Sequence, residues 1–434
     1  MKRRQFLISS TALGAATLSG CIGSDDSEES DSDTDIQDSD GDGVIDSEDY
    51  APHDPDVQQK SDLQSETNST TSSTTSTTES TTEPTSNGNG IQVDKSDFST
   101  AESRFVEYSL TNVRVYIHPD DPAVTETANQ ALWIIGADYS REGIHVSKRK
   151  SVDLTQSASQ VTVDVEWESK PVGEPLHYMM ILAPEDVDYE DLSGSNTSYL
   201  TETDAFEIQS DRQSIEKTAI SEIEELGDDR GERYERTNRE GQFALSFSGR
   251  TRGRTWDVNF VIYKSAYVAA VRRDHGRRRS QFVTYEMANG FAGELATILS
   301  DEAEKNDYTG KREKVGFVID FIQFLPYVPD DVSTDFDDYT KYCTESLVEL
   351  GGDCEDSAIL LASVLQAEPF EYDMVLLQPP GHMAAGIYGK DDLPGYYWEY
   401  DGRKYYYIET TGVGWGVGDL PDEYKDEEAY VHPV

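Results

Sequence analysis

A cysteine, a histidine and a glutamate in the C-terminal part of the chain are the residues best suited to chemistry. Cys354 follows Gly-Gly-Asp and opens a mainly apolar run, which predicts a buried helix with Asp353 as its N-cap. A thiol at a helix N-terminus meets the positive end of the helix dipole and free backbone N–H groups, and both favour the nucleophilic thiolate. Cys354 is therefore the candidate nucleophile, with a buried structural cysteine as the alternative.

His382 and Glu409 provide the two further groups that a thiol nucleophile needs. His382 lies at the start of a predicted strand, and Glu409 ends the second strand of a predicted hairpin that turns at Asp401-Gly402. In this arrangement His382 takes the thiol proton, and Glu409 accepts a hydrogen bond from the other imidazole nitrogen. The backbone N–H of Cys354 is the expected oxyanion donor. The predicted reaction is acyl transfer, in which Cys354 attacks an amide carbonyl, forms a thioester and releases an amine.

Three segments around these residues resemble the transglutaminase-like superfamily of cysteine acyl-transfer enzymes. They are Gly-Gly-Asp-Cys-Glu-Asp at 351–356, Gly-His-Met-Ala at 381–384 and Tyr-Tyr-Ile-Glu-Thr-Thr at 406–411, and the resemblance covers about residues 281–427. It implies a papain-like α+β core, in which a helix bearing the cysteine packs on an antiparallel sheet bearing the histidine and the acid. It also implies a protein or peptide substrate and no cofactor for catalysis. The chain departs from the family's pattern at Glu409, where Asp is usual.

These residues leave the details of the chemistry open. Water as the acyl acceptor would make the protein a peptidase or amidase, and a lysine amine would make it a crosslinking enzyme. A non-catalytic module that binds peptide or glycan at the cell surface is the alternative function. A metal site of Cys343, Cys354 and His382 is a weaker interpretation, because it lacks a fourth ligand. A disulfide between Cys343 and Cys354 would block the nucleophile.

The whole chain carries a large excess of acidic residues. Its 434 residues include 85 Asp and Glu against 36 Lys and Arg, for a net charge of -49. Such a field repels phosphate, which excludes a nucleic-acid partner. We interpret the charge as adaptation to molar salt, where a Debye length of about 3 Å screens self-repulsion. Three cysteines are too few for a disulfide framework, so the domains must depend on apolar cores.

The region before the transglutaminase-like domain, residues 93–280, is predicted to be a β-rich accessory domain, which makes the fold class α+β. Residues 161–167 alternate apolar and polar side chains, as a half-buried strand does. Residues 212–226 are predicted to form an exposed helix. Eight arginines between residues 250 and 279 are interpreted as individually paired surface groups, with docking to the acidic C-terminal domain as the alternative.

The first 20 residues have the features of an export signal. Paired arginines precede an apolar run that is too short to span a membrane, and Leu-Ser-Gly precedes Cys21. This order resembles a twin-arginine lipoprotein signal. Cleavage would leave Cys21 as a lipid-bearing first residue. We therefore expect the protein on the extracellular face of the cell membrane, anchored to the membrane by the lipid.

Residues 21–92 are predicted to form a disordered, acidic, Ser/Thr-rich stalk. Within it, residues 38–52 have the spacing of a calcium-binding loop, and Gly43 permits its sharp turn. An acidic low-complexity run is the alternative interpretation. Sequons at Asn68 and Asn196 predict N-glycosylation. The expected Ca²⁺ ligands are Asp38, Asp40, Asp42, Asp46 and Asp49.

Overall fold

A computed structural model describes most of the chain from Gly90 onward. The described residues are 4–5, 90–141, 143–155, 157–193, 196–276, 278–330, 339–389 and 393–434. All of them belong to one of the chain's two compact units, which comprises Met1–Ser9 and Thr81–Val434. Apart from residues 4–5, the predicted signal peptide lies outside the described residues, as do Cys21, the calcium loop and Asn68. Within the described ranges, no helix is long and apolar enough to cross a membrane.

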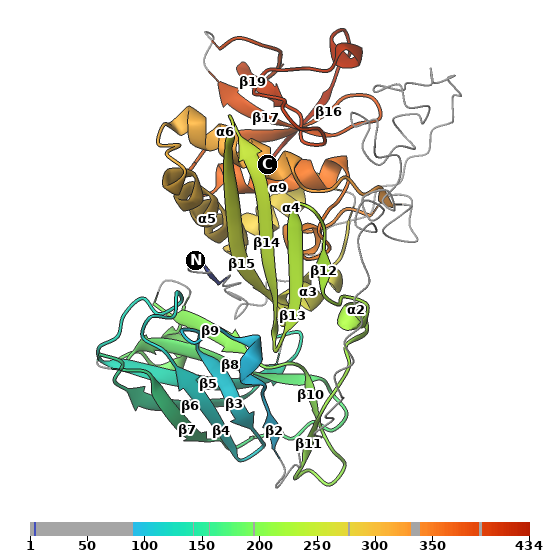
Figure 1. Ribbon diagram of the computed structural model, residues 1–434. Coiled ribbons are helices and arrows are strands. Elements are labelled where there is room, and N and C mark those ends of the chain that lie inside the picture. The colour runs from blue at the N-terminus through green and yellow to red at the C-terminus, as the bar shows by residue number, and fades with distance from the viewer. Residues whose placement is uncertain are drawn as a thin grey trace, which may run out of the picture. The chain divides into compact units, whose positions relative to one another are not determined.

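Two antiparallel sheets contribute the residues of the first hydrophobic core (Figure 1). One sheet has the order β2-β3-β4-β7, and the other has the order β11-β10-β8-β5-β6 with β9 paired to β8. The predicted alternation is confirmed in β7, where Val161 and Val163 are buried and their neighbours are exposed. The strands are β2 (Ile91–Gln92), β3 (Arg104–Tyr108), β4 (Asn112–Ile117), β5 (Gln130–Asp138), β6 (Ile144–Val152), β7 (Ser159–Asp164), β8 (Leu176–Pro184), β9 (Ser198–Glu202), β10 (Phe206–Ile208) and β11 (Ile215–Lys217); short 3-10 helices are η1 (Lys95–Asp97) and η2 (Tyr189–Asp191).

The helix predicted over residues 212–226 is wrong for most of that range. Ile215–Lys217 form strand β11, and only Ser221–Glu224 form a short helix, α2. Ile215 is buried in the core of the two sheets, and β11 pairs with β10. Burial in the tertiary structure therefore overrides the local helical pattern.

A third antiparallel sheet packs against helices of the C-terminal part. Its order is β12-β13-β14-β15, and β1 (Arg4–Gln5) runs parallel to β15. Trp256 of β15 contacts the rings of Phe317, Phe321 and Phe324. This sheet thus shares its core with the C-terminal helices, although it lies within the predicted accessory domain. The strands are β12 (Asp229–Arg230), β13 (Tyr234–Arg239), β14 (Gln242–Thr251) and β15 (Arg254–Tyr263).

Helix α9 (Cys354–Gln366) is the central helix of the C-terminal part. It packs against α4, α5 and α6 and against strands β16 and β17. All residues from Ala358 to Leu365 are buried, which confirms the helix predicted from the apolar run. The other helices are α3 (Lys264–Val271), α4 (Arg279–Ala288), α5 (Phe291–Lys305), α6 (Lys311–Gln323) and α8 (Cys343–Val348).

The last sheet places two predicted site residues at one of its ends. Its order is β18-β19-β17-β16-β20, all antiparallel. Ala385 of β17 pairs with Ile408 of β19, so His382 and Glu409 lie at the same end of neighbouring strands. The predicted hairpin turn at Asp401-Gly402 is confirmed. The strands are β16 (Met374–Gln378), β17 (Ala384–Gly389), β18 (Tyr397–Tyr400), β19 (Arg403–Ile408) and β20 (Tyr430–Pro433), and η3 (Asp422–Tyr424) precedes β20.

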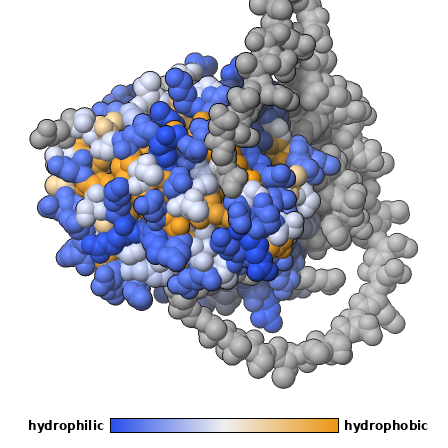
Figure 2. Space-filling view, turned by 90° about the horizontal axis from the view of Figure 1, so that it is seen from below, coloured by the Kyte–Doolittle hydropathy of each residue, from blue (hydrophilic) through white to orange (hydrophobic). Residues whose placement is uncertain are grey.

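The described part of the chain is thus a mixed α and β structure with several antiparallel sheets. Figure 2 shows that its surface, seen from below, is mostly hydrophilic, with hydrophobic residues in small areas between. A hydrophilic surface around separate apolar cores agrees with the acidic composition.

Candidate active site

Helix α9 begins at Cys354, as the sequence predicts. Asp353 is its N-cap, and the Asp353 side chain accepts a hydrogen bond from the backbone N–H of Asp356. Gly351 brings this turn against the loop after α6, because a Cβ at Gly351 would lie 2.5 Å from the carbonyl oxygen of Pro326. Only glycine permits this close approach. The start of α9 is therefore fixed by backbone contact as well as by the cap.

His382 and Glu409 form a direct pair. The His382 Nε2 lies 3.2 Å from Oε1 and 3.1 Å from Oε2 of Glu409. The same carboxylate accepts hydrogen bonds from the Tyr407 hydroxyl at 2.6 Å and from the Thr411 hydroxyl at 2.8 Å. Gln323 of α6 donates to the Glu409 carbonyl oxygen at 2.9 Å, so the backbone of this residue is fixed too. The acid of the predicted triad is thus held rigidly at the end of β19.

The ionisation of this pair follows from its surroundings. Burial alone would raise the pKa of Glu409, but His382 and the donors around the carboxylate hold that pKa well below its usual range. Burial alone would lower the pKa of His382, but the charge and hydrogen bond of Glu409 outweigh it, and the pKa lies above its usual value. Glu409 is therefore charged, and it strengthens His382 as a base.

Cys354 lies beside this pair. The backbone N–H of Met383, the residue after His382, hydrogen-bonds the Cys354 sulfur and favours its thiolate. The hydrogen bonds that His382 makes within the described residues both use Nε2, which leaves Nδ1 as the base for the thiol. The structure thus brings Cys354, His382 and Glu409 together from helix α9, the loop before β17 and the end of β19.

The thiolate that the helix N-terminus was expected to favour is not the resting state. Burial raises the pKa of Cys354 well above its usual value, and the charges of Asp353 and Glu355 raise it further. The thiol donates a hydrogen bond to Oε2 of Glu355, with 3.3 Å between sulfur and oxygen. Two acidic neighbours therefore oppose the helix dipole, and a neutral thiol rests beside a strengthened base.

Tyr424 covers the imidazole. Its ring is stacked on the ring of His382, with 5.5 Å between centroids and 1° between planes. Tyr424 lies in η3, and β20 then joins the edge of the sheet beside β16. The C-terminal segment therefore holds an aromatic ring against the His382 imidazole.

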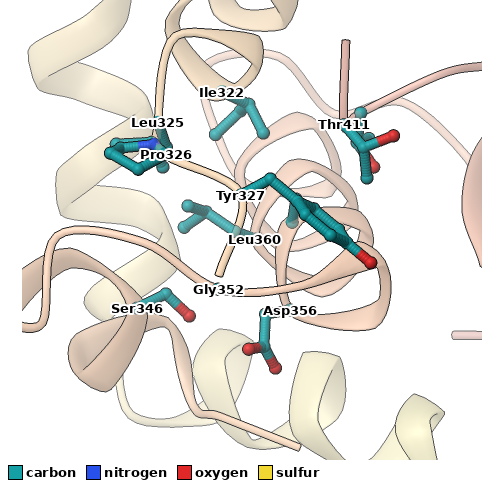
Figure 3. A pocket seen from close by; sticks show the side chains of 11 residues that line it. Ile322, Leu325, Pro326, Tyr327, Ser346, Gly352, Asp356, Leu360 and Thr411 are labelled. Carbon is teal, nitrogen blue, oxygen red and sulfur yellow. The ribbon is translucent and has the colours of Figure 1, made fainter. Parts of the chain in front are cut away.

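A small hollow lies beside the start of α9 (Figure 3). Figure 3 shows the Tyr327 ring extending across it. Leu360 and Asp356 of α9 lie below, and Thr411 lies at the upper right. The hollow has room for about one water molecule, so it cannot hold a substrate side chain. Its lining residues are Ile322, Leu325, Pro326, Tyr327, Ser346, Gly352, Asp356, Ser357, Leu360, Thr410 and Thr411.

One group of possible metal ligands occurs among the described residues. The ligand atoms of Asp353, Cys354 and Glu355 all lie within 4.8 Å of one another. Each has another role: Asp353 caps α9, and the Cys354 thiol bonds to Glu355. Neither Cys343 nor His382 belongs to the group, and we assign no metal to it.

Two other predicted residues have local structural roles. Cys343 and Cys354 are both free thiols, and Cys343 is buried at the start of α8. The Asn196 side chain hydrogen-bonds the carbonyl oxygen of Asp191 and the backbone N–H of Ser193. Glycosylation at Asn196 stays a prediction.

Sequence reasoning missed three side chains around the thiol. Glu355 follows Cys354 directly, Arg279 donates to Oε1 of Glu355 at 3.0 Å, and Tyr424 covers His382. Only Glu355 had a signal, which was its position next to the nucleophile. Arg279 belongs to the arginine-rich stretch; there Arg272 pairs with Glu222, as a surface ion pair would. Arg279, in contrast, contacts Glu355, the residue next to Cys354.

Comparisons with known proteins give no match: no protein-family model fits the chain, and no curated protein matches it. The function must therefore be argued from the residues and their geometry.

Proposed function

We propose that the C-terminal part of the chain is a transglutaminase-like cysteine acyl-transfer enzyme with a papain-like core. One observation carries the proposal. The sulfur of Cys354 lies at the N-terminus of a buried helix and is hydrogen-bonded by the residue after His382, whose Nε2 is paired with Glu409. Thiol catalysis needs a nucleophile, a base and an orienting acid in one site, and these contacts support that grouping.

The arrangement of elements supports the papain-like core. α9 packs against β16 and β17, and the sheet presents the histidine and the acid at the end that meets the start of the helix. A nucleophile on a helix and a base on an adjacent sheet keep their positions because both elements are rigid.

The proposed reaction begins with transfer of the thiol proton to Nδ1 of His382. The sulfur forms a bond to the amide carbonyl carbon, and the carbonyl oxygen accepts a hydrogen bond from the backbone N–H of Cys354. As the first residue of α9, Cys354 has an N–H that the helix cannot satisfy. The imidazolium then gives its proton to the amide nitrogen, the C–N bond breaks and an amine leaves. Water or a lysine amine takes the acyl group from the thioester.

Profiling of substrates tests this proposal. Purified wild type and Cys354→Ala are incubated in molar salt with surface proteins, and new crosslinks and new termini are identified by mass spectrometry. We expect products from wild type and from the matched control Cys343→Ala, and none from Cys354→Ala. Products that persist in Cys354→Ala would exclude thiol chemistry. Binding of the same proteins without products in any variant would favour the non-catalytic peptide- or glycan-binding module.

The proposal includes export and attachment to the outer face of the membrane through lipid on Cys21, where protein or peptide substrates are within reach. Its support is the order of paired arginines, apolar run and cysteine in the sequence. Cys21→Ser should release the protein into the medium. Calorimetry with Ca²⁺ against Mg²⁺ tests the loop of Asp38, Asp40, Asp42, Asp46 and Asp49, and heat specific to Ca²⁺ is expected.

A further inference from the structure

A chain of polar contacts leads from the Cys354 thiol through Glu355 to Arg279 of α4. The Cys354 thiol donates to Oε2 of Glu355 at 3.3 Å, and Arg279 of α4 donates to Oε1 of the same carboxylate at 3.0 Å. The side chains of Glu355 and Arg279 are 11% and 15% exposed, so solvent screens this contact only in part. The resting thiol proton is thus directed at Glu355 and not at His382.

We propose that Glu355 holds the thiol proton of Cys354 away from His382 and so keeps the nucleophile at rest, and that Arg279 offsets the charge of Glu355 and so limits this hold. The inference deepens the proposed function, because it concerns the control of the same thiol. Activation then requires the thiol to rotate from Glu355 to His382. The S–H bond breaks, the proton forms a bond to Nδ1, and the result is a thiolate beside an imidazolium that Glu409 stabilises.

Glu355 remains an acceptor because of its own partners. Burial alone would raise its pKa, but hydrogen bonds with Asp353, Cys354 and Arg279 hold it below its usual value. The Cys354 thiol and Arg279 donate to different oxygens of the Glu355 carboxylate, which holds it in one orientation.

Groups from other elements also act on the thiol or its base. The Met383 backbone N–H from the loop before β17 favours the thiolate. Tyr327, from the loop after α6, and Tyr424, from η3, lie close enough for the charge of Cys354 to raise their pKa. Glu423 adds negative charge near His382 but is exposed. Glu355 differs from Glu423 because it hydrogen-bonds the sulfur itself.

The test measures the thiol and needs no substrate. The rate of iodoacetamide labelling at Cys354 is followed from pH 6 to pH 10 in molar salt, with peptide mapping to separate Cys354 from Cys343. We expect Glu355→Gln to label roughly tenfold faster at neutral pH, since removal of an adjacent charge and acceptor shifts the thiol pKa by about one unit. Arg279→Gln should label several-fold more slowly, because the charge of Glu355 is then uncompensated.

Two controls separate the contact from general charge effects. Glu423→Gln removes an equal charge near the same site and should change the rate less than about twofold in molar salt, where exposed charges are screened. Glu355→Gln combined with Arg279→Gln should resemble Glu355→Gln alone, because Arg279 acts through Glu355. Thermal unfolding shows which variants are folded, and the opposite direction expected for Arg279→Gln provides a second result if Glu355→Gln does not fold.

The inference is overturned if Glu355→Gln labels no faster than wild type, if Glu423→Gln accelerates labelling as much, or if Arg279→Gln also accelerates it. None of these results bears on turnover. Conversely, a protein without any Cys354-dependent products would end the proposed function and leave the labelling rates unchanged.

Discussion

Two histidine–glutamate pairs lie among the described residues of the C-terminal part, and they differ in the partner of the second ring nitrogen. His382 and Glu409 are joined through Nε2 beside Cys354. His275, between α3 and α4, has its Nε2 3.0 Å from Oε2 of Glu345 in α8. The two pairs have the same residue types, similar distances and largely buried side chains.

The pairs differ in what the second imidazole nitrogen does. Nδ1 of His275 hydrogen-bonds the carbonyl oxygen of Arg273 at 2.7 Å, so both ring nitrogens are occupied. Tyr339 also contacts this pair and is stacked on the histidine. Cys343 lies two residues before Glu345, but its thiol is buried, and burial and Glu286 raise its pKa. The His275 pair therefore fastens α8 to the loop before α4, whereas His382 keeps a nitrogen for the thiol.

The largest expected difference between the pairs is in turnover. Glu409→Gln should lower kcat roughly 10³–10⁴-fold, because the imidazole loses the charge that fixes its tautomer and stabilises the imidazolium. Glu345→Gln should leave kcat within about threefold of wild type in folded protein. Initial rates on the substrate found by profiling, corrected for the folded fraction, measure both. Equal losses in the two variants would contradict the division into a catalytic and a structural pair.

For protein stability we expect the opposite order, in which the His275–Glu345 pair matters more than the His382–Glu409 pair. Loss of the buried negative charge opposite His275 in Glu345→Gln should lower the free energy of unfolding by about 3–5 kcal/mol. Burial lowers the pKa of His275, but Glu345 outweighs it and the pKa is raised. The stability from His275 is thus fully present below about pH 6.5 and is lost as pH rises through the folded pKa. The gap between wild type and His275→Gln in denaturant titrations should shrink toward alkaline pH; a constant gap would exclude this ion pair as the cause.

The buried carboxyl group of Glu286 should have a smaller effect, on stability alone. It is fully buried in α4, accepts the Cys343 backbone N–H at 2.9 Å, and burial raises its pKa to about 7. A raised carboxyl pKa means that stability falls as pH rises from about 4.5 to 7. Glu286→Gln stays neutral and can still accept the hydrogen bond. It should match wild type near pH 4.5 and exceed it by up to about 3 kcal/mol at pH 8. Chemical denaturation at the two pH values checks this, and a variant less stable at pH 8 would contradict it.

The smallest expected effect concerns Tyr424. Tyr424→Ala removes the ring over His382 and should lower kcat about tenfold, through looser orientation of the base and easier entry of water. Tyr424→Phe keeps the stacked ring and should restore kcat to within about twofold of wild type. KM should change little in either variant if the ring acts on the base. A loss in Tyr424→Phe as large as in Tyr424→Ala would assign the effect to the hydroxyl.

Much of the local structure could be predicted from the sequence because it depends on short-range patterns. The apolar run after Asp353 gives α9, alternation gives β7, and Asp401-Gly402 gives the hairpin of β18 and β19. The helix predicted over residues 212–226 fails because β11 pairs with a strand of the core. Periodicity reports local preference, and pairing with distant strands can override it.

The site was predictable only in part, for the same reason. Cys354, His382 and Glu409 stand next to recognisable turns and strand ends, so their types and order are visible in the chain. The environment of the thiol is not visible in the sequence. The helix N-terminus alone favours a thiolate, but Asp353, Glu355 and burial reverse this in the folded protein.

The sequence by itself determined the acidic surface, the apolar core helix, the hairpin and the identity of the three candidate catalytic residues. These follow from composition, periodicity and turn residues, which act over a few positions. Only the tertiary structure decided that His382 and not His275 has a nitrogen left for a thiol, and that Arg279 contacts the residue beside the nucleophile. Burial and contacts between distant segments set these outcomes, because a side chain's pKa and partners depend on what packs around it.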